Sequence, residues 1–224
     1  MTAYGWFLSI TLIGPVAAAI VPAWRRYLPR ARGVAFVWLF VSTPWLLLDS
    51  WQHTVGFWHY DSRYVSGLMI LNLPLDEALF FYAVPLACLL LWHIVRPIKI
   101  LTQLGWATIL GQVVLALAMV AWAWPLPIRS GIDLLLFMTT LIFVLLSRQV
   151  TTHFLSWTVV VMGCFLLTNT YLTALPIVIY NDSLMVPWRL GTIPVSDIHY
   201  NFAFLWSALI VYLSSTRIPQ DQLW

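Results

Sequence analysis

Two acidic sites in the sequence share one setting, three residues after a proline and directly before an apolar run. Glu77 follows Pro74, with Asp76 beside it, and Asp197 follows Pro194. Proline is tolerated in the first turn of a helix, where its missing N–H needs no partner. Acids favour helix starts through the helix dipole, but an ionisable group bordering a membrane run is by default a candidate functional group. Glu77, Asp76 and Asp197 are therefore candidate functional residues.

The helices that carry these acids are expected to lie in a lipid bilayer. Of the 224 residues, 62% are hydrophobic and only 8% are charged, against roughly 25% charged residues in a soluble domain. The net charge of +3 is small and its basic residues are thinly spread, so it gives no argument for binding nucleic acid. Membrane lipids are the expected surroundings. Cys88 and Cys164 fall inside apolar runs, which predicts helix packing and no disulfide framework.

Seven apolar runs reach or approach the roughly 20 residues that a membrane helix needs. The first run ends at Arg25 and Arg26 without a small-residue cleavage pattern, so we expect it to be retained as a helix. The predicted fold class is an all-α polytopic membrane protein with seven transmembrane helices. The runs are Tyr4–Trp24, Val34–Leu48, Ala78–Val95, Ile100–Trp124, Ile132–Ser147, Phe154–Leu172 and Ile198–Leu213.

The distribution of charge predicts the orientation of these helices. With the amino terminus outside and the carboxyl terminus cytoplasmic, eight basic residues face the cytoplasm and three face out, as the positive-inside rule requires. The acids lie mostly at the outer ends of helices, so carboxylate chemistry is expected near the outer boundary of the cell membrane. The eight are Arg25, Arg26, Arg30, Arg32, Arg96, Lys99, Arg148 and Arg217, and the three are Arg63, Arg129 and Arg189.

The two halves of the chain align with each other at a constant offset of 120 residues. The offset contains four helices, which makes both halves point the same way. We therefore expect two parallel three-helix repeats, 1–96 and 125–224, joined by a linker helix in 97–124, within a single transmembrane domain, 1–224. Parallel repeats commonly place a site at their interface. The aligned pairs are Asp49 with Asn169, Tyr60 with Tyr180, Asp61 with Asn181, Pro74 with Pro194, Glu77 with Asp197, Phe80 with Tyr200 and Trp92 with Tyr212.

The first acidic segment resembles a known family motif. Pro-Leu-Asp-Glu-Ala-Leu-Phe-Phe, residues 74–81, is similar to the Pro-Leu-Glu-Glu-x-x-Phe-Phe motif of the lycopene cyclase domain. That domain belongs to the small, membrane-integral cyclases that bind no flavin. Trp-His-Tyr-Asp, residues 58–61, resembles the Trp-x-Tyr-Asn stretch that precedes the motif. Residues 172–181 and 191–202 look like the family's second copy, fused here in one chain.

The resemblance covers roughly residues 49–92 and 168–212, with motifs that agree in order and spacing. The sequence departs from the family's pattern at three positions. Asp76 stands where the family usually has glutamate, Ser196 stands where an acid is usual, and His199 stands where an aromatic residue is common. Asp197 is therefore the lone acid of the second motif.

This resemblance implies an enzyme, a lycopene cyclase that makes a β-ring carotenoid such as β-carotene. A proton added to the terminal double bond gives a tertiary cation, the neighbouring double bond closes on it, and loss of a proton completes the isomerisation. No net electrons move, and the sequence has no Gly-x-Gly-x-x-Gly fingerprint, so no cofactor is expected. The resemblance implies Glu77 as the proton donor, with Asp76 and Asp197 as partners in proton transfer.

The implied substrate is an acyclic carotenoid that enters laterally from the bilayer. Aromatic rings can shield a carbocation through their faces, and asparagine side chains can hydrogen-bond a carboxyl. The fusion of both copies lets one chain suffice, and the sequence is also compatible with a homodimer. The candidate substrate-binding residues are Trp58, Tyr60, Phe80, Phe81, Tyr200, Asn201 and Asn72.

Other functions share some of these features. A cation-forming cyclase of another terpenoid or of a C50 carotenoid would use the same scaffold, and a β-ring, an ε-ring, and one or two cyclised ends all stay open. A proton-coupled transporter would need polar groups at mid-membrane depth, whereas the acids cluster at one boundary. A retinal photoreceptor needs a buried lysine, but the single lysine is Lys99, in a short inner loop. The five histidines form no i, i+4 pair, which disfavours a metal enzyme.

Overall fold

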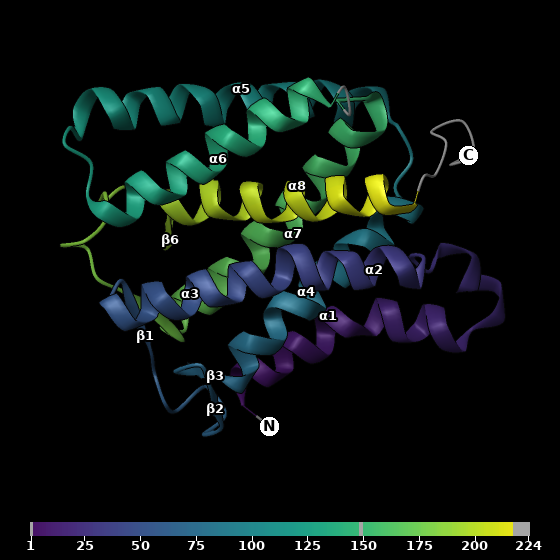
Figure 1. The fold of residues 1–224 in the computed structure, drawn as a ribbon, viewed down its shortest axis with the longest axis horizontal. Coiled ribbons are helices and arrows are strands. Elements are labelled where there is room, and N and C mark those ends of the chain that lie inside the picture. The colour runs from purple at the N-terminus through teal and green to yellow at the C-terminus, as the bar shows by residue number, and fades with distance from the viewer. Residues whose placement is uncertain (1, 148–149, 217–224) are drawn as a thin grey trace. The chain divides into compact units, whose positions relative to one another are not determined.

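The computed structural model describes residues 2–147 and 150–216, which fold almost entirely into helices (Figure 1). These residues form two compact units. The first unit holds residues 2–54, 60–94 and 204–216, and the second holds residues 55–59, 95–147 and 150–203.

Three membrane-length helical segments build the first unit. Helix α1 (Ala3–Ile20) packs along α4 (Leu75–Ile94) (Figure 1). The short 3₁₀ helix η1 (Pro22–Tyr27) follows α1. The third segment is continuous from residue 31 to 55. Its parts are α2 (Ala31–Val37), the π-helical turn η2 (Trp38–Ser42) and α3 (Thr43–Val55).

The π-helical turn has a local cause in Pro44. Proline offers no N–H, and its ring crowds the carbonyl four residues earlier, so a regular α-helix cannot continue through it unchanged. The helix widens just before this residue, and the backbone N–H of Thr43 donates to the carbonyl of Trp38, five residues back. The Thr43 hydroxyl donates to the same carbonyl at 2.8 Å. The segment therefore passes the proline without breaking.

Helices α5, α6 and α7 form most of the second unit, and α5 packs closely along α7. The close approach requires a glycine, because a β-carbon on Gly105 would lie 2.8 Å from the Leu155 β-carbon. Helix α8 contributes residues 195–203 to this unit and its remainder to the first unit. The bounds are α5 (Lys99–Trp122), α6 (Ile128–Leu146), α7 (Thr152–Ala174) and α8 (Val195–Thr216).

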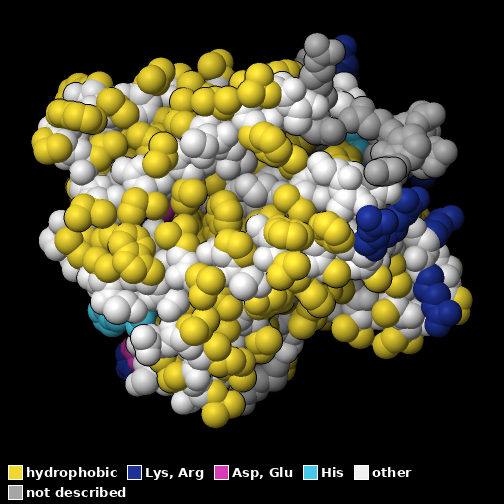
Figure 2. Space-filling view, in the orientation of Figure 1, with side chains coloured by type: hydrophobic (Ala, Val, Ile, Leu, Met, Phe, Trp, Pro, Cys, Tyr) yellow, Lys and Arg dark blue, Asp and Glu magenta, His cyan; other side chains and the backbone are white. Residues whose placement is uncertain are grey.

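Six helical segments of the described residues are long and apolar enough to cross a membrane: α1, the 31–55 segment, α4, α5, α6 and α7. Apolar side chains cover much of the face shown in Figure 2. These features indicate a multi-pass membrane protein. The predicted seventh run, Ile198–Leu213, lies in α8, which is helical over 22 residues but is not among the six. Polar side chains such as His199 and Asn201 lower its hydropathy, so the count of seven stays a prediction.

A small β-hairpin precedes each helix that carries candidate acids. In the first hairpin Met69 pairs with Pro74, and in the second Arg189 pairs with Pro194, so the two registers repeat at the offset of 120. Strands β1 and β4 form a third two-stranded sheet. The bounds are β1 (Trp58–Tyr60), β2 (Met69–Ile70), β3 (Leu73–Pro74), β4 (Val178–Tyr180), β5 (Arg189–Leu190) and β6 (Ile193–Pro194).

Equivalent backbone hydrogen bonds fix the start of α4 and of α8. The N–H of Leu75 donates to the carbonyl of Leu68 at 2.8 Å, and the N–H of Val195 donates to the carbonyl of Trp188 at 3.0 Å. Each hairpin therefore ends where its helix begins. The candidate acids lie in the first turn of both helices, as the two proline motifs predict.

The two hairpins turn through different residues. The first turn holds Leu71 at φ 51° and Asn72 at φ 63°, and the second holds Gly191 at φ 62°. Glycine adopts this left-handed backbone without steric cost, asparagine tolerates it, and leucine is strained there. Asn72 is exposed in this turn, and its residue type fits the backbone conformation.

Basic side chains gather at one end of the first unit. Arg25, Arg26, Arg30 and Arg32 are exposed in and around η1 and α2, and Figure 2 shows a cluster of Lys and Arg side chains at one edge. Two other basic residues expected on the cytoplasmic side, Arg148 and Arg217, lie outside the described residues. The orientation of the chain in a membrane and the bounds and layout of the two repeats stay predictions.

Candidate active site

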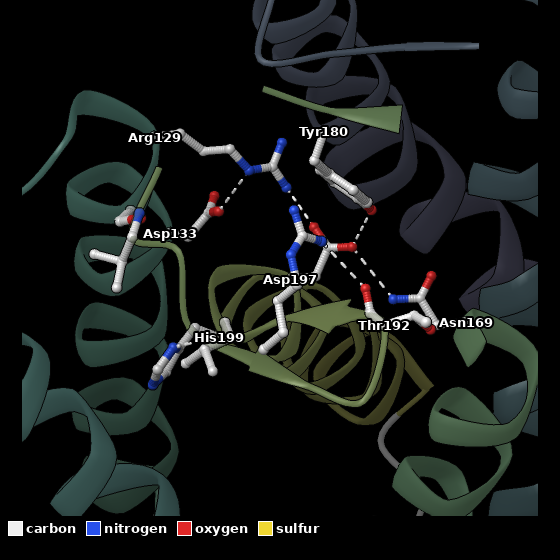
Figure 3. A network of polar contacts seen from close by, with 11 residues as sticks. Arg129, Asp133, Asn169, Tyr180, Thr192, Asp197 and His199 are labelled. Carbon is white, nitrogen blue, oxygen red and sulfur yellow. Dashed lines mark hydrogen bonds and ion pairs between the residues drawn. The ribbon is translucent and has the colours of Figure 1, made fainter. Parts of the chain in front are cut away.

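In the second unit, the Asp197 carboxyl is the centre of a polar network (Figure 3). It lies in the first turn of α8 and is 9% exposed. Arg129 Nη2 donates to Oδ1 at 2.5 Å, and Asn169 Nδ2 donates to Oδ2 at 3.2 Å. The Tyr180 hydroxyl also donates to Oδ2. Three segments, α6, α7 and β4, thus direct donors at one carboxyl.

These partners fix the hydrogen-bond roles of the two carboxyl oxygens. A guanidinium and an amide nitrogen can only donate hydrogen bonds. Because Arg129 bonds one oxygen of Asp197 and Asn169 bonds the other, both oxygens act as acceptors. Both oxygens of Asp197 therefore receive hydrogen bonds from neighbouring segments of the second unit.

Arg129 is the second residue of α6 and is 2% exposed. Its Nε lies 3.1 Å from Oδ2 of the buried Asp133, one turn further along the same helix. Its guanidinium also lies 4.0 Å from the centroid of the Trp58 ring and 5.9 Å from that of the Tyr200 ring. Burying a charge is costly without partners, and here two carboxylates and aromatic faces supply them.

Two predicted substrate-binding aromatics, Trp58 and Tyr200, thus face a cation of the protein itself. They were expected to shield a carbocation, and the structure places both against Arg129. Sequence reasoning omitted Arg129 and its partner Asp133 from the site. The available signal was an arginine at the start of an apolar run with an aspartate four residues later, a spacing that lets the two side chains meet on a helix.

In the first unit, Glu77 lies in the first turn of α4 and is 7% exposed. The hydroxyl of Tyr4 donates to Glu77 Oε2 at 2.6 Å. Tyr4 is itself 1% exposed, and its backbone N–H bonds the carbonyl of Tyr64 at 3.1 Å. A phenol can donate to a carboxylate or accept from a protonated carboxyl, so this contact is compatible with either form of Glu77.

The carboxyl of Asp76 has a different neighbour. It accepts a hydrogen bond from the backbone N–H of Ser66, in the loop that leads to the first hairpin. Asp76 is 7% exposed. Its observed contact ties the loop to the start of α4, and a part in proton transfer stays a prediction.

Aromatic rings pack close to Glu77 along α4. Phe81 is one turn further on and lies 5.4 Å from the Phe204 ring, and Phe80 stacks between Phe7 at 6.1 Å and Phe204 at 6.5 Å. The third predicted aromatic of this unit, Tyr60, lies 5.5 Å from the ring of His53. Phe80 and Phe81 therefore belong to one aromatic cluster on the helix that carries Glu77.

The two predicted asparagines are placed apart from these carboxyl contacts. Asn201 is buried and donates to the sulfur of Met162 at 3.4 Å, and Asn72 is exposed in the first hairpin turn. Neither asparagine is observed to form the expected bond to a carboxyl. Their contact with substrate stays a prediction. Within residues 2–147 and 150–216, no group of three or more His, Cys, Asp and Glu side chains is placed to hold a metal ion.

Equivalent positions in the two units carry different chemistry. Tyr4 is the second residue of α1 and bonds the third residue of α4, while Arg129 is the second residue of α6 and bonds the third residue of α8. A phenol therefore faces Glu77 where a guanidinium faces Asp197. The two acidic sites are built on one plan but are not interchangeable.

Comparison with known proteins agrees with this two-copy plan. No curated protein and no solved structure matches the chain. The family model described as lycopene cyclase matches it twice, over residues 3–95 and over residues 128–214, which together make up more than half of its length. The first match contains Tyr4 and Glu77, and the second contains Arg129 and Asp197. The chain belongs to the lycopene cyclase family.

Proposed function

We propose that this protein is a carotenoid end-group cyclase that converts lycopene to a β-ring carotenoid such as β-carotene. Membership of the lycopene cyclase family supports carotenoid cyclisation in general. The observation that carries the specific reaction is Glu77, a carboxyl shielded from water in the first turn of a helix and bonded to the Tyr4 phenol. Such a carboxyl can hold the proton that the first step consumes.

The reaction begins with transfer of a proton from Glu77 to the terminal double bond of an acyclic end group. A C–H bond forms, the π bond breaks, and a tertiary carbocation remains. The neighbouring double bond then closes on this cation, which forms a C–C bond and moves the positive charge onto the new ring. Loss of a ring proton restores a double bond. The substrate gains and loses one proton, so no electrons are exchanged and no redox cofactor is consumed.

The aromatic cluster near Glu77 supports a reaction through a cation. Phe80 and Phe81 follow Glu77 on the same helix, and their ring faces carry negative electrostatic potential that attracts a positive charge. We assign the stabilisation of the ring cation to the aromatic cluster that these two rings belong to. The phenyl rings have no nucleophilic atom that would trap the cation, so they suit an intermediate that must still lose a proton.

The other two predicted carboxyls receive supporting roles in this proposal. Asp197 accepts hydrogen bonds from Arg129, Asn169 and Tyr180, so it holds α6, α7 and β4 at the start of α8. Asp76 holds the preceding loop through Ser66. In this proposal Asp197 orders the second unit, Asp76 orders the loop of the first unit, and Glu77 is the group that touches the reacting atoms.

The surface of the protein supports delivery of the substrate from the membrane. Helices α1 and α5 expose large apolar side chains such as Ile13, Leu110 and Leu117. A carotenoid dissolves in the hydrocarbon that such a surface contacts. We propose that the end group enters laterally from the bilayer and not from water.

Pigment analysis of a lycopene-accumulating host tests the proposal. Cells that express the wild-type chain are expected to contain cyclic carotenoids, and cells that express Glu77→Gln are expected to retain lycopene. Asp182→Asn is the matched control, because Asp182 is an exposed acid whose ion pair with Arg189 lies on the surface of the second unit. It removes one carboxylate and is expected to cyclise like the wild type.

Unchanged lycopene in cells with well-expressed wild-type protein would overturn lycopene as the substrate. Feeding C50 carotenoids and other acyclic terpenoids to the same membranes would then identify the polyene that is cyclised. Wild-type activity in Glu77→Gln, with equal protein levels, would remove Glu77 from the reaction while leaving the cyclase function in place.

A further inference from the structure

A third buried acid of the first unit, Asp49, lies in α3 and has no part in the mechanism above. It is 5% exposed in the helix that precedes the first hairpin. Burying a carboxyl is costly unless its surroundings compensate. Its position along α3 can be compared with the position of Glu77 along α4.

The register of α3 and α4 brings Asp49 level with Glu77. The two helices run in roughly opposite directions (Figure 1), and the hydroxyls of Thr43 and Tyr82 lie 3.2 Å apart. Asp49 is six residues beyond Thr43 along α3, and Glu77 is five residues before Tyr82 along α4. At about 1.5 Å per residue these steps are ~9 and ~7.5 Å, so the two acids differ in height by ~1.5 Å.

Each acid lies on the face of its helix that contacts Phe204. The rings of Trp45 and Phe81 lie 5.8 and 5.4 Å from that of Phe204. Asp49 is four residues after Trp45, and Glu77 is four residues before Phe81. Residues four apart on a helix share a face, so both acids lie one turn beyond the contact with Phe204, in the same direction.

The second unit shows the contact that this geometry produces. Asn169 and Asp197 are the residues 120 positions after Asp49 and Glu77, and Asn169 Nδ2 lies 3.2 Å from Asp197 Oδ2. The hairpin registers and the starts of α4 and α8 repeat at the same offset. In the first unit the amide of this pair is replaced by a carboxyl.

We propose that Asp49 and Glu77 form a carboxyl pair that shares one proton and acts as the acid–base pair of the cyclisation. The assignment rests on the function proposed above. Two carboxyls within hydrogen-bond distance cannot both be charged without strong repulsion, so one keeps a proton that its partner accepts. The second unit has an amide and a guanidinium in the corresponding places, and both donate hydrogen bonds to Asp197. The transferable proton therefore belongs to the first unit.

The pair closes the proton balance of the reaction. The shared proton moves to the terminal double bond and leaves two carboxylates beside a carbocation, whose positive charge offsets their repulsion. Ring closure follows. One carboxylate of the pair then takes the ring proton, and the pair returns to its starting state with one proton. Donor and acceptor are thus members of the same site, and no other group has to supply or remove a proton.

Infrared spectroscopy of the full-length protein in lipid vesicles detects such a proton directly. A protonated carboxyl gives a C=O stretching band that shifts in D₂O and is distinct from carboxylate bands. The wild type and Asp182→Asn are expected to show this band without any substrate. Asp49→Asn and Glu77→Gln are each expected to abolish or shift it, because each removes one member of the pair. A band that is unchanged by Asp49→Asn would overturn the proposal.

Cyclisation rates supply the second readout. Each single substitution is expected to slow cyclisation about 100-fold or more, in the range of general acid–base catalysis, and Asp49→Asn/Glu77→Gln is expected to be no slower than Glu77→Gln alone. Thermal unfolding followed by tryptophan fluorescence checks that the variants fold. A wild type with the band but no cyclisation would refute the proposed function and keep the pair. Cyclisation that survives Asp49→Asn at the wild-type rate, with the band unchanged, would refute the pair and keep the function.

Discussion

Tyr4 on α1 donates a 2.6 Å hydrogen bond to Glu77 in the first turn of α4, so two buried side chains 73 residues apart meet at one carboxyl. The bond holds the Glu77 oxygen in a fixed place relative to α1. It also distinguishes this acid from Asp197, whose corresponding neighbour is a guanidinium.

Tyr4→Phe is expected to keep the ring packing and remove this one bond. We expect a loss of about 1 kcal/mol in unfolding free energy, the usual net value of a buried hydrogen bond, and a fall in the cyclisation rate with a smaller change in KM. Thermal unfolding and rate measurements on membranes check both. Tyr27→Phe is the control, because the Tyr27 hydroxyl bonds Arg26 at the surface. Equal effects of the two substitutions would contradict a specific role for Tyr4.

Arg129→Met is expected to be among the most damaging single substitutions. It leaves Asp133 and Asp197 buried without their common cation, a loss of about 3–5 kcal/mol by comparison with other broken buried ion pairs. Asp197→Asn in the same chain should recover part of this loss, because it removes one of the two stranded charges. Unfolding of the wild type, both single variants and the double variant in detergent gives the coupling energy. Strictly additive effects would mean that the two side chains do not stabilise each other.

Asp76 is expected to tolerate asparagine better than alanine. Asparagine keeps an oxygen that can accept the Ser66 N–H, whereas alanine leaves that buried bond unmade. Asp76→Ala should lower the unfolding free energy by about 1–2 kcal/mol and expose the loop at 61–68 to proteases, and Asp76→Asn should stay close to the wild type in both measurements. Loss of all cyclisation in a stable, protease-resistant Asp76→Asn protein would instead assign this carboxyl a chemical role.

Opposite substitutions in the two hairpin turns are expected to change the unfolding free energy in opposite directions. Leu71→Gly should stabilise the protein by about 1 kcal/mol, because it relieves a left-handed backbone at φ 51°. Gly191→Leu should destabilise it by a similar amount at φ 62°. Both positions belong to exposed turns, so side-chain packing changes little. Thermal midpoints that move in the same direction for both variants would contradict this account.

Local features of the site could be predicted from the sequence because local chemistry determines them. The two prolines predicted acids in the first turn of a helix, and α4 and α8 begin at Leu75 and Val195. The offset of 120 predicted which residues correspond, and the hairpin registers repeat at that offset. Asn169, which the offset pairs with Asp49, bonds Asp197.

The partners from the first helix of each copy could not be predicted in this way. Tyr4 and Arg129 are 125 residues apart, so a constant offset of 120 does not align them. Only the packing of α1 against α4, and the bonds from α6 to α8, reveal that they hold the same place. The number of membrane helices could not be predicted from the sequence either. Helix α8 is long enough to cross a bilayer but begins with polar residues, and it is not among the six candidate spans.

The phenol in one copy and the guanidinium in the other have an evolutionary consequence. When two identical subunits assemble, every mutation appears in both, and a change that suits one site is imposed on the other. Duplication within a single reading frame removes that constraint, so selection can tune each copy alone. A tandem of two first copies would lack the Arg129 cation, and a tandem of two second copies would lack the Glu77 carboxyl. The fused chain therefore keeps two different carboxyl environments, one of which a duplicate of either half would lose.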